Sequence, residues 1–425
     1  MTKNEQIKAS IAKTSQRRKS QICRVYKVKI DESRLSVKQK EQLKMLFIEA
    51  KWFYNWLLAN KENLSSINAQ KVHTIEKLNK DKQEETVELK FIKSSQRDSV
   101  LEGIKSSLKT MKSLREKGIQ KHWTLKFTSE YKSIELKQFG ITHKIRGKRA
   151  MIIQGISKKV PVNGLKQLPE NCDIANAKLL NTPTGYYVAL TTYSFKNDVK
   201  EAAKTKPIIG IDFGCQTSLT YSDGRTKTTI AIGETEHLKR LQRKLAKQTK
   251  GSNNRNRTKK LINIEYQKIS NRKNDIANKI VAELKQHKLV VIQDEQLASW
   301  QKNHHGKAIQ HSCLGRIKTK LKQLDNCIVL SKDIPTTKIC MNCGKIHEMK
   351  LSDRTFQCDC GIKEDRDIHA AKNMLEIFKM LNNTFQIPLE QRKFKREEFL
   401  EAYEKKFGVG CGTLRHEDAT FQGCH

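Results

Sequence analysis

Apolar and polar positions change their period several times along the chain, first near the N-terminus. Between residues 24 and 30, Tyr26, Val28 and Ile30 alternate with other residues, as in a half-buried strand. From residue 36 to about residue 60, apolar residues recur at helical spacing; they are Leu43, Leu46, Phe47, Ala50, Phe53, Tyr54, Leu57 and Leu58. A second helical pattern comprises Val100, Leu101, Ile104, Leu108, Met111 and Leu114. Residues 36–122 are therefore predicted to form a small helical domain.

Two tryptophans lie beside the first helical stripe. Trp52 and Trp56 are four residues apart, so they share one side of the predicted helix. Such a pair packs against a core more often than it stacks on bases. We expect core packing and keep base stacking as the alternative.

The pattern changes to strands after residue 123. The β-prone runs are residues 133–137, 151–156 and 186–193, and turn residues such as Thr182-Pro183-Thr184-Gly185 separate them. The strand at residues 24–30 has no neighbour in sequence, so we expect it to join this sheet. The helical domain is then an insertion in a β-barrel-like unit made of residues 24–35 and 123–200.

A second sheet is predicted after a charged linker. Residues 207–213 form an apolar run that contains Asp212 near its end. Two short strands at 217–221 and 227–232 follow, joined by the hairpin turn Asp223-Gly224. Three strands in a meander, with an acid on the first, are typical of an RNase H-like sheet.

Residues 239–273 contain thirteen Lys and Arg residues and a single acid, Glu265. Leucine and isoleucine keep a weak helical rhythm there, and Gly251-Ser252-Asn253-Asn254 interrupts it. The segment is predicted to be a helical hairpin. Because almost no acids balance its charge, a nucleic-acid-facing role is favoured over a merely solvated helix pair.

Composition agrees with a nucleic-acid partner. The chain has 425 residues, enough for two to four domains, and 83 Lys and Arg against 45 Asp and Glu give a net charge of +38. Binding to phosphates releases condensed counterions, so such an excess favours a polyanionic partner. The first 23 residues are expected to be a flexible basic arm. No apolar run is long enough to cross a bilayer, so we expect a cytoplasmic protein without a membrane partner.

Three acids have the positions that metal-dependent phosphodiester cleavage requires. Such chemistry needs carboxylates that converge on Mg²⁺ ions from strand ends or rigid helices. Asp212 ends the first strand of the second sheet, and Glu295 follows the apolar run at 289–292. Asp367 opens a helix whose Ala370 and Ala371 permit close packing on the sheet. Each acid alone could also belong to a turn, to the surface or to a helix cap.

Four of the eleven cysteines lie between the second and third acids. Cys340 and Cys343 have the usual two-residue spacing of a zinc knuckle, whereas Cys358 and Cys360 are one residue closer together. Paired thiolates from two knuckles suit one tetrahedral, structural Zn²⁺, and His347 is the alternative ligand. The other cysteines are scattered, which argues for reduced thiols and not for a disulfide framework.

The order of these features resembles that of TnpB proteins of bacterial transposons and the related miniature type V CRISPR effectors. The resemblance is carried by Gly-Ile-Asp212-Phe-Gly, Gln-Asp-Glu295-Gln-Leu, the cysteine knuckles and Asp365-Arg-Asp367-Ile-His-Ala-Ala-Lys-Asn. It covers residues 207–375 closely, and residues 24–200 mainly in architecture.

The resemblance implies an α/β and α+β multidomain fold with the following parts. They are a basic arm at 1–23, a wedge-like β-barrel at 24–35 and 123–200, a helical recognition domain at 36–122, a RuvC nuclease domain at 201–335 and 362–385, a zinc ribbon that binds target nucleic acid at 336–361, and a C-terminal tail at 386–425.

The resemblance also implies an activity and a site. Asp212, Glu295 and Asp367 would form the RuvC triad with two Mg²⁺ ions. Glu295 is preferred over Asp294, and Asp367 over Asp365, because of their places in the matching motifs. A guide RNA would pair with double-stranded target DNA, and one site would cut both strands.

Two other functions share parts of this pattern. A guide-free RuvC-type resolvase or transposase would use the same core, but it would leave the N-terminal 200 residues and the ribbon without a purpose. A repressor that binds nucleic acid would not need all three acids. The oligomeric state, the flanking DNA motif, the cut positions and the origin of the guide are not predicted.

Overall fold

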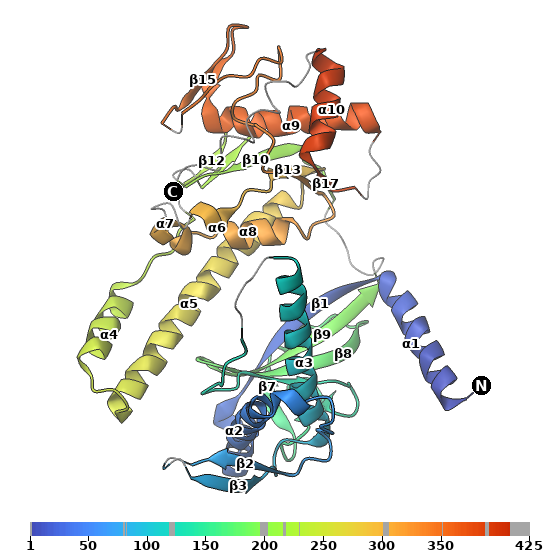
Figure 1. The fold of residues 1–425 in the computed structure, drawn as a ribbon, viewed down its shortest axis with the longest axis vertical. Coiled ribbons are helices and arrows are strands. Elements are labelled where there is room, and N and C mark those ends of the chain that lie inside the picture. Colours follow the sequence, from blue (N-terminus) through green and yellow to red (C-terminus); the bar gives the residue numbers. More distant parts are fainter. Residues whose placement is uncertain are drawn as a thin grey trace. The chain divides into compact units, whose positions relative to one another are not determined.

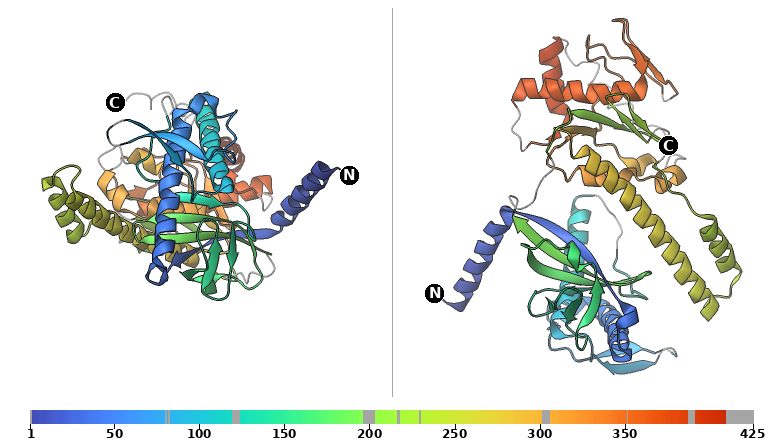
Figure 2. Two further views of the ribbon diagram at one scale, coloured as in Figure 1. Left: turned by 90° about the horizontal axis from the view of Figure 1, so that it is seen from below. Right: turned by 180° about the vertical axis from the view of Figure 1, so that it is seen from behind.

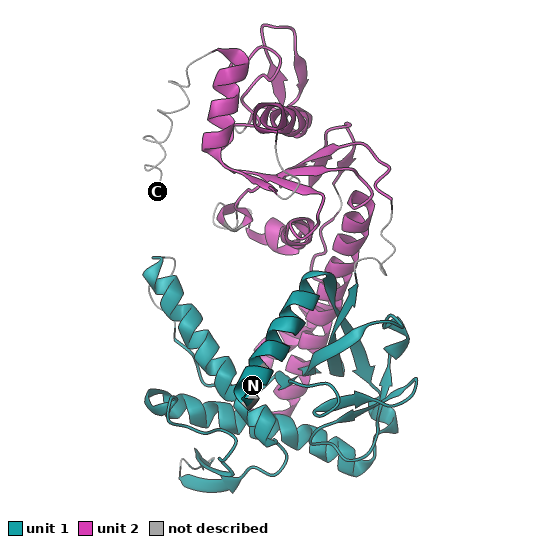
Figure 3. Ribbon diagram, turned by 90° about the vertical axis from the view of Figure 1, so that its right-hand side faces the viewer, with its two compact units in different colours: residues 1–200 teal, residues 201–425 magenta. Residues whose placement is uncertain are grey.

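The computed structural model describes residues 2–408, apart from residues 80, 82, 119–123, 196–202, 216–217, 229, 301–305, 351 and 387–390. The chain divides into two compact units, Met1–Lys200 and Glu201–His425 (Figure 3). We refer to them as unit 1 and unit 2, and describe each by itself.

Unit 1 is built on one seven-stranded antiparallel sheet that curls into a nearly closed barrel. Its strands in sheet order are β4 (Ser133–Leu136), β8 (Asp173–Thr182), β9 (Gly185–Phe195), β1 (Gln21–Ile30), β7 (Val160–Asn163), β6 (Ala150–Ile153) and β5 (His143–Ile145). β1 pairs with β9 from Gln21 to Lys29 and with β7 at its end. The N-terminal strand therefore joins the later sheet, as its missing sequence neighbour predicts.

Two long helices are inserted after β1. α2 (Val37–Ala59) and α3 (Ser94–Glu116) lie in the segment predicted to be helical (Figure 1). Ser36 caps α2, because its hydroxyl accepts the N–H of Gln39 and the Gln39 side chain accepts the N–H of Ser36. The predicted apolar stripe of α2 faces the core of unit 1.

Three features of unit 1 differ from the sequence prediction or extend it. Residues 3–19 of the predicted basic arm form helix α1 (Lys3–Lys19), with a capping box between Thr2 and Glu5. The helical segment also contains a β-hairpin, β2 (Thr74–Leu78) and β3 (Glu84–Glu88). Single turns of 3₁₀ helix occur at η1 (Glu32–Arg34), η2 (Lys61–Asn63) and η3 (Leu165–Gln167).

Unit 2 contains a six-stranded mixed sheet with helices on both faces (Figures 1 and 2). In sheet order its strands are β12 (Thr226–Lys227), β11 (Leu219–Tyr221), β10 (Ile209–Phe213), β13 (Val290–Gln293), β14 (Cys327–Leu330) and β17 (Lys393–Phe394). β10, β11 and β12 form the predicted antiparallel meander, although β12 is shorter than expected. β10, β13, β14 and β17 are parallel to one another.

The two faces of this sheet bury different sides of the central strands. Val290 and Ile292 pack on one face with apolar residues of α5 (Asn253–Leu284) and α8 (Leu314–Leu321). Val291 points to the other face and packs with residues of α9 (Arg366–Phe385) and α10 (Arg396–Phe407). Burial on both faces explains why these strands are continuous apolar runs.

The remaining helices of unit 2 are α4 (Glu236–Lys247), α6 (Leu297–Trp300) and α7 (Gly306–His311). α4 and α5 contact each other and form the predicted basic helical hairpin, with Leu238, Leu241, Ile262 and Ile269 buried between them. Among the residues that the structure describes, no helix is long and apolar enough to cross a membrane.

The prediction of a tail from residue 386 is wrong for residues 393–407. β17 extends the parallel sheet next to β14, and α10 packs against α9 with Phe399, Ala402 and Tyr403 buried. The many charged residues of this segment make its apolar face hard to recognise in the sequence. That face is buried against α9. Residues 387–390 and 409–425 of the predicted tail lie outside the described residues.

Candidate metal centres

The sheet of unit 2 brings the three predicted acids to one edge. Asp212 lies on β10, and Glu295 follows β13 by two residues. β10 and β13 are adjacent and parallel, with Ile211 opposite Ile292, so both acids lie at the carboxyl ends of neighbouring strands. Asp367 is in the first turn of α9, which packs against β10 and β13.

The close approach of α9 to the sheet depends on small residues. Gly210 lies on β10 directly beneath α9, and an added Cβ there would collide with the carbonyl oxygen of Ala371. Ala370 and Ala371 are fully buried, as their small size in the sequence predicts. The helix can therefore hold Asp367 near the ends of β10 and β13.

Neighbouring carboxyl groups oppose the ionisation of Asp212 and of Glu295. Burial raises the pKa of Asp212 well above its ordinary value, and the charges of Glu295 and Asp367 raise it further, whereas Arg366 lowers it. Burial also raises the pKa of Glu295 to about 7; Asp367 adds to this effect and Lys318 opposes it. Two buried acids with raised pKa values beside a third acid form an environment suited to a cation.

One oxygen of Glu295 lacks a protein partner. Its Oε2 atom is buried, and within the described part of the chain it has no hydrogen bond. A buried carboxylate oxygen without a partner is costly unless a cation binds it. Carboxylate oxygens are the ligands that Mg²⁺ prefers, so the acid trio fits the divalent ions that the sequence predicts.

Asp294 and Asp365, the two acids not assigned to the triad, have other partners. Asp294 forms ion pairs with Lys318 at 3.2 Å and with Lys322 at 2.5 Å. Asp365 is the N-cap of α9, since its carboxylate accepts the backbone N–H of Asp367 at 2.9 Å and of Ile368 at 3.1 Å. Helix capping, considered as a role for Asp367, is therefore done by Asp365.

Lys318 is a member of this site that the sequence reasoning missed. Its side chain is buried, its ammonium donates to the backbone carbonyl of Glu295, and burial lowers its pKa. The sequence contains a signal, because Lys318 falls on the apolar stripe formed by Leu314, Ile317 and Leu321 of α8. A lysine on the buried face of a helix needs a partner.

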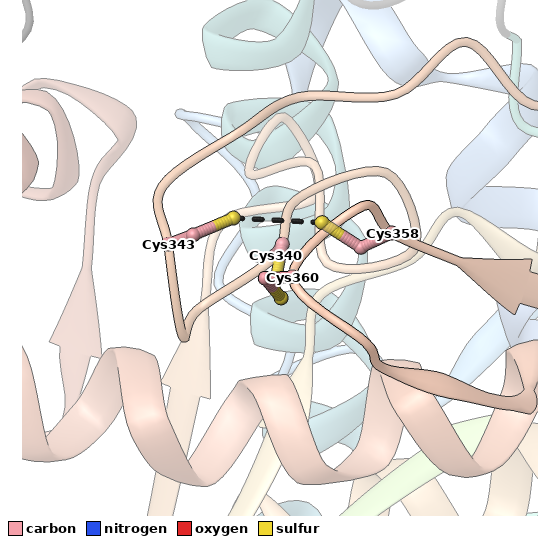
Figure 4. A group of neighbouring side chains, drawn as sticks. All are labelled: Cys340, Cys343, Cys358 and Cys360. Atoms are coloured by element: carbon pink, nitrogen blue, oxygen red, sulfur yellow. Dashed lines mark hydrogen bonds between the residues drawn. The ribbon is translucent and has the colours of Figure 1, made fainter.

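The four predicted cysteines form a second centre (Figure 4). The ligand atoms of Cys340, Cys343, Cys358 and Cys360 all lie within 4.8 Å of one another. Cys340 Sγ is 3.5 Å from Cys360 Sγ, and Cys343 Sγ is 3.5 Å from Cys358 Sγ. The shorter spacing of the second pair therefore does not prevent convergence. His347 is outside this group and packs edge-on against Phe356.

Two tight turns shape this centre. The N–H of Gly344 donates to the carbonyl of Cys340, and the N–H of Gly361 donates to the carbonyl of Cys358. Both glycines have positive φ, 77° and 95°, which favours residues without a Cβ. Within the described residues, only the cysteine group brings three or more possible ligand atoms this close together.

The two tryptophans of α2 are partly buried. Trp52 and Trp56 pack partly against the core of unit 1, and they also line an open hollow of about 620 Å³. Lys77 lies 5.0 Å above the Trp52 ring, and Phe127, also in the lining, is 68% exposed. Core packing is thus confirmed in part, and the lining also suits a stacked base.

Comparison with known protein families supports the resemblance predicted from the sequence. Residues 191–302 match a protein family described as "Probable transposase", and residues 314–374 match one described as "Cas12f1-like, TNB domain". The resemblance to TnpB is confirmed. The two matched segments contain the three acids and the four cysteines.

Curated relatives agree with this resemblance. A Streptomyces pristinaespiralis protein named "Putative RNA-guided DNA endonuclease" is 26% identical over 221 residues, 49% of this chain and 54% of its own length. A "Putative transposase" of Acanthamoeba polyphaga mimivirus is 27% identical over 188 residues, 39% of each chain. A "TnpB-like protein" of the same virus is 49% identical over 43 residues, 10% of this chain and 8% of its own length. The matches thus span about half or less of the length of these relatives.

Proposed function

We propose that this protein is a metal-dependent, RNA-guided DNA endonuclease with a single nuclease site formed by Asp212, Glu295 and Asp367. The observation that carries the proposal is the convergence of three carboxyl groups at one edge of the sheet, where Oε2 of Glu295 has no partner in the described structure. The name of one relative, "Putative RNA-guided DNA endonuclease", supports the choice of DNA as substrate and RNA as guide.

The chain's own residues would prepare this site for phosphodiester hydrolysis. Asp212, Glu295 and Asp367 present carboxylate oxygens from two strand ends and one helix. Lys318 holds the backbone at Glu295 and offsets part of the negative charge. Two bound Mg²⁺ ions would supply an activated water and stabilise the attacking and leaving oxygens.

The proposed nucleic-acid partners agree with the charge of the molecule. The net charge of +38 and the basic α4–α5 hairpin favour a guide RNA and double-stranded target DNA over an uncharged substrate. The four cysteines would hold one structural Zn²⁺ in the ribbon that follows α8. Because its substrate would be cellular DNA, we place its action in the cytoplasm, at the nucleoid.

Substitution of Asp212 tests the site directly. Asp212→Ala should reduce Mg²⁺-dependent cleavage by more than about 100-fold, the upper end of losses for outer-shell partners of metal ligands. RNA binding should remain, because the substitution removes none of the basic side chains of α4 and α5. Asp223→Ala, which removes an exposed turn acid of the same sheet, is the matched control and should cleave normally. Undiminished Mg²⁺-dependent cleavage by Asp212→Ala would contradict the proposal.

A further inference from the structure

A buried side chain of the helix that carries Asp367 contacts the four-cysteine ribbon at several points. His369 lies two residues after Asp367 in α9 and is 2% exposed. Its ring stacks on Phe356 of β15 (Thr355–Gln357), with centroids 3.5 Å apart and an interplanar angle of 12°. Phe356 is itself buried and packs in the cluster of Cys340 and Cys358.

The two ring nitrogens of His369 contact two more parts of the ribbon. Nδ1–H donates to the carboxylate of Glu364 on β16 (Lys363–Asp365) at 2.9 Å. Nε2 lies 2.9 Å from the carbonyl oxygen of Ile339, the residue that precedes Cys340. Asn373, one turn further along α9, donates to the same carbonyl at 2.7 Å. One imidazole therefore touches the strand before the second cysteine pair, the strand after it, and the approach to the first pair.

This contact lies next to the point where β16 of the ribbon continues into α9. β16 ends at Asp365, and the carboxylate of Asp365 caps α9 through the N–H of Asp367. The sheet supports α9 at Ala371, where Gly210 allows close contact. The preceding turn, which contains Asp367, is supported from the ribbon side by His369.

We propose that His369 is a positioning residue that couples the ribbon to the carboxylate of Asp367, and so sets the affinity of the acid trio for divalent cations. This inference rests on the proposed function, since it assumes that the trio binds cations. It assigns the ribbon a role within the nuclease site, in addition to any contact with nucleic acid. His369 would act through the orientation of the first turn of α9, without touching substrate.

Two substitutions separate the stack from the hydrogen bonds. His369→Phe keeps an aromatic ring against Phe356 but loses both ring nitrogens, whereas His369→Asn keeps a polar group and loses the stack. Phe378→Leu is the matched control, because it reduces aromatic packing further along α9, where Phe378 contacts Phe394. It should lower stability without altering the first turn of the helix.

The readout is Mn²⁺ binding to the full-length protein–RNA complex, measured by the electron paramagnetic resonance signal of free Mn²⁺. The Mn²⁺ binding that is lost in Asp212→Ala is assigned to the acid trio. In both His369 variants this dissociation constant should rise by about 10-fold or more, as expected for outer-shell partners of metal ligands. Zinc content should stay at one per chain. Phe378→Leu should bind Mn²⁺ as the wild type does.

A second position keeps the test decisive if the His369 variants fold poorly. Glu364→Gln removes the charge that faces Nδ1 and Lys372 while keeping the shape of the side chain. It should also weaken Mn²⁺ binding, and Glu376→Gln, which alters an exposed pair with Lys379 on the same helix, should not. Wild-type Mn²⁺ affinity in His369→Phe, His369→Asn or Glu364→Gln would overturn the coupling. If Asp212→Ala removed no Mn²⁺ binding, the proposed nuclease site itself would be wrong.

Discussion

At the scale of single residues, the candidate nuclease site is defined by carboxyl groups that resist ionisation. Asp212 and Glu295 are buried beside Asp367, and the pKa of Glu295 is raised to about 7. The positive charges of Arg366 and Lys318 lower the pKa of Asp212 and of Glu295 respectively, and a backbone hydrogen bond at Phe213 also lowers that of Asp212. A divalent cation would supply the missing positive charge, so cation binding and proton release should be linked.

This linkage predicts how the Mg²⁺ requirement changes with pH. A proton competes with Mg²⁺ for Glu295 as the pH falls through about 7, so half-maximal cleavage at pH 6 should need about 10-fold more Mg²⁺ than at pH 8. The half-saturating Mg²⁺ concentration is the quantity to measure, because the cleavage rate also depends on water ionisation. Equal Mg²⁺ requirements at pH 6 and pH 8 would contradict the raised pKa.

The coupling between cation binding and proton release also affects folding stability. An acid whose pKa is raised on folding destabilises the native state as the pH rises from its unfolded pKa through its folded pKa. At pH 8 the cation-free site should therefore cost more stability than at pH 6. Mg²⁺ should accordingly raise the melting temperature more at pH 8 than at pH 6, and Asp212→Ala should reduce that difference.

At the scale of elements, the site depends on how closely α9 packs on the sheet. Gly210→Ala would place a Cβ against the carbonyl oxygen of Ala371, where backbone on both sides leaves no room. We expect a loss of about 1–3 kcal/mol in the free energy of unfolding, together with impaired cleavage, because α9 carries Asp367. Thermal unfolding and a Mg²⁺-dependent cleavage assay would measure both effects.

Gly315 provides the control for this substitution. It lies in the first turn of α8, where an added Cβ would be 4.0 Å from Leu297, an ordinary contact. Gly315→Ala should leave stability within about 1 kcal/mol of the wild type, because alanine suits a helix better than glycine. If Gly210→Ala proved as stable and active as Gly315→Ala, the close approach of α9 would not matter for the site.

The ribbon is the second element that can be tested alone. Cys340→Ser combined with Cys343→Ser should release the bound zinc and lower the melting temperature, because two of four thiolate ligands are lost. Cys23→Ser, at an exposed cysteine of β1, should keep the zinc. Metal analysis of the purified proteins decides the matter, and an unchanged zinc content in the double variant would refute the four-cysteine site.

The sequence predicts the elements that have strong patterns. β10 and β13 are continuous apolar runs, and Ala370 and Ala371 indicate the close packing of α9, so the gathering of Asp212, Glu295 and Asp367 could be expected. The β2–β3 hairpin could not be predicted, because its residues are mostly polar and its two strands are evident only from their pairing. β17 and α10 were missed for a related reason, since their few apolar residues become informative only when α9 and β14 provide a partner surface.

At the scale of the whole molecule, the charge of +38 needs a partner. An excess of this size disfavours the compact state by self-repulsion, and a bound polyanion would relieve it. Basic residues occur in both units, on α1 as well as on the α4–α5 hairpin. A guide RNA would supply phosphates to the protein and, by base pairing, the sequence specificity that basic helices alone do not provide.

Sequencing the RNA that copurifies with the protein would establish whether a guide RNA directs it to its target. The protein should be purified from cells that carry its native locus, and the bound RNA recovered and sequenced. We predict one discrete RNA with a constant scaffold and a variable end, and its genomic origin would distinguish a transposon from a CRISPR array. Random RNA fragments would contradict guided recognition and would favour a guide-free nuclease with the same site.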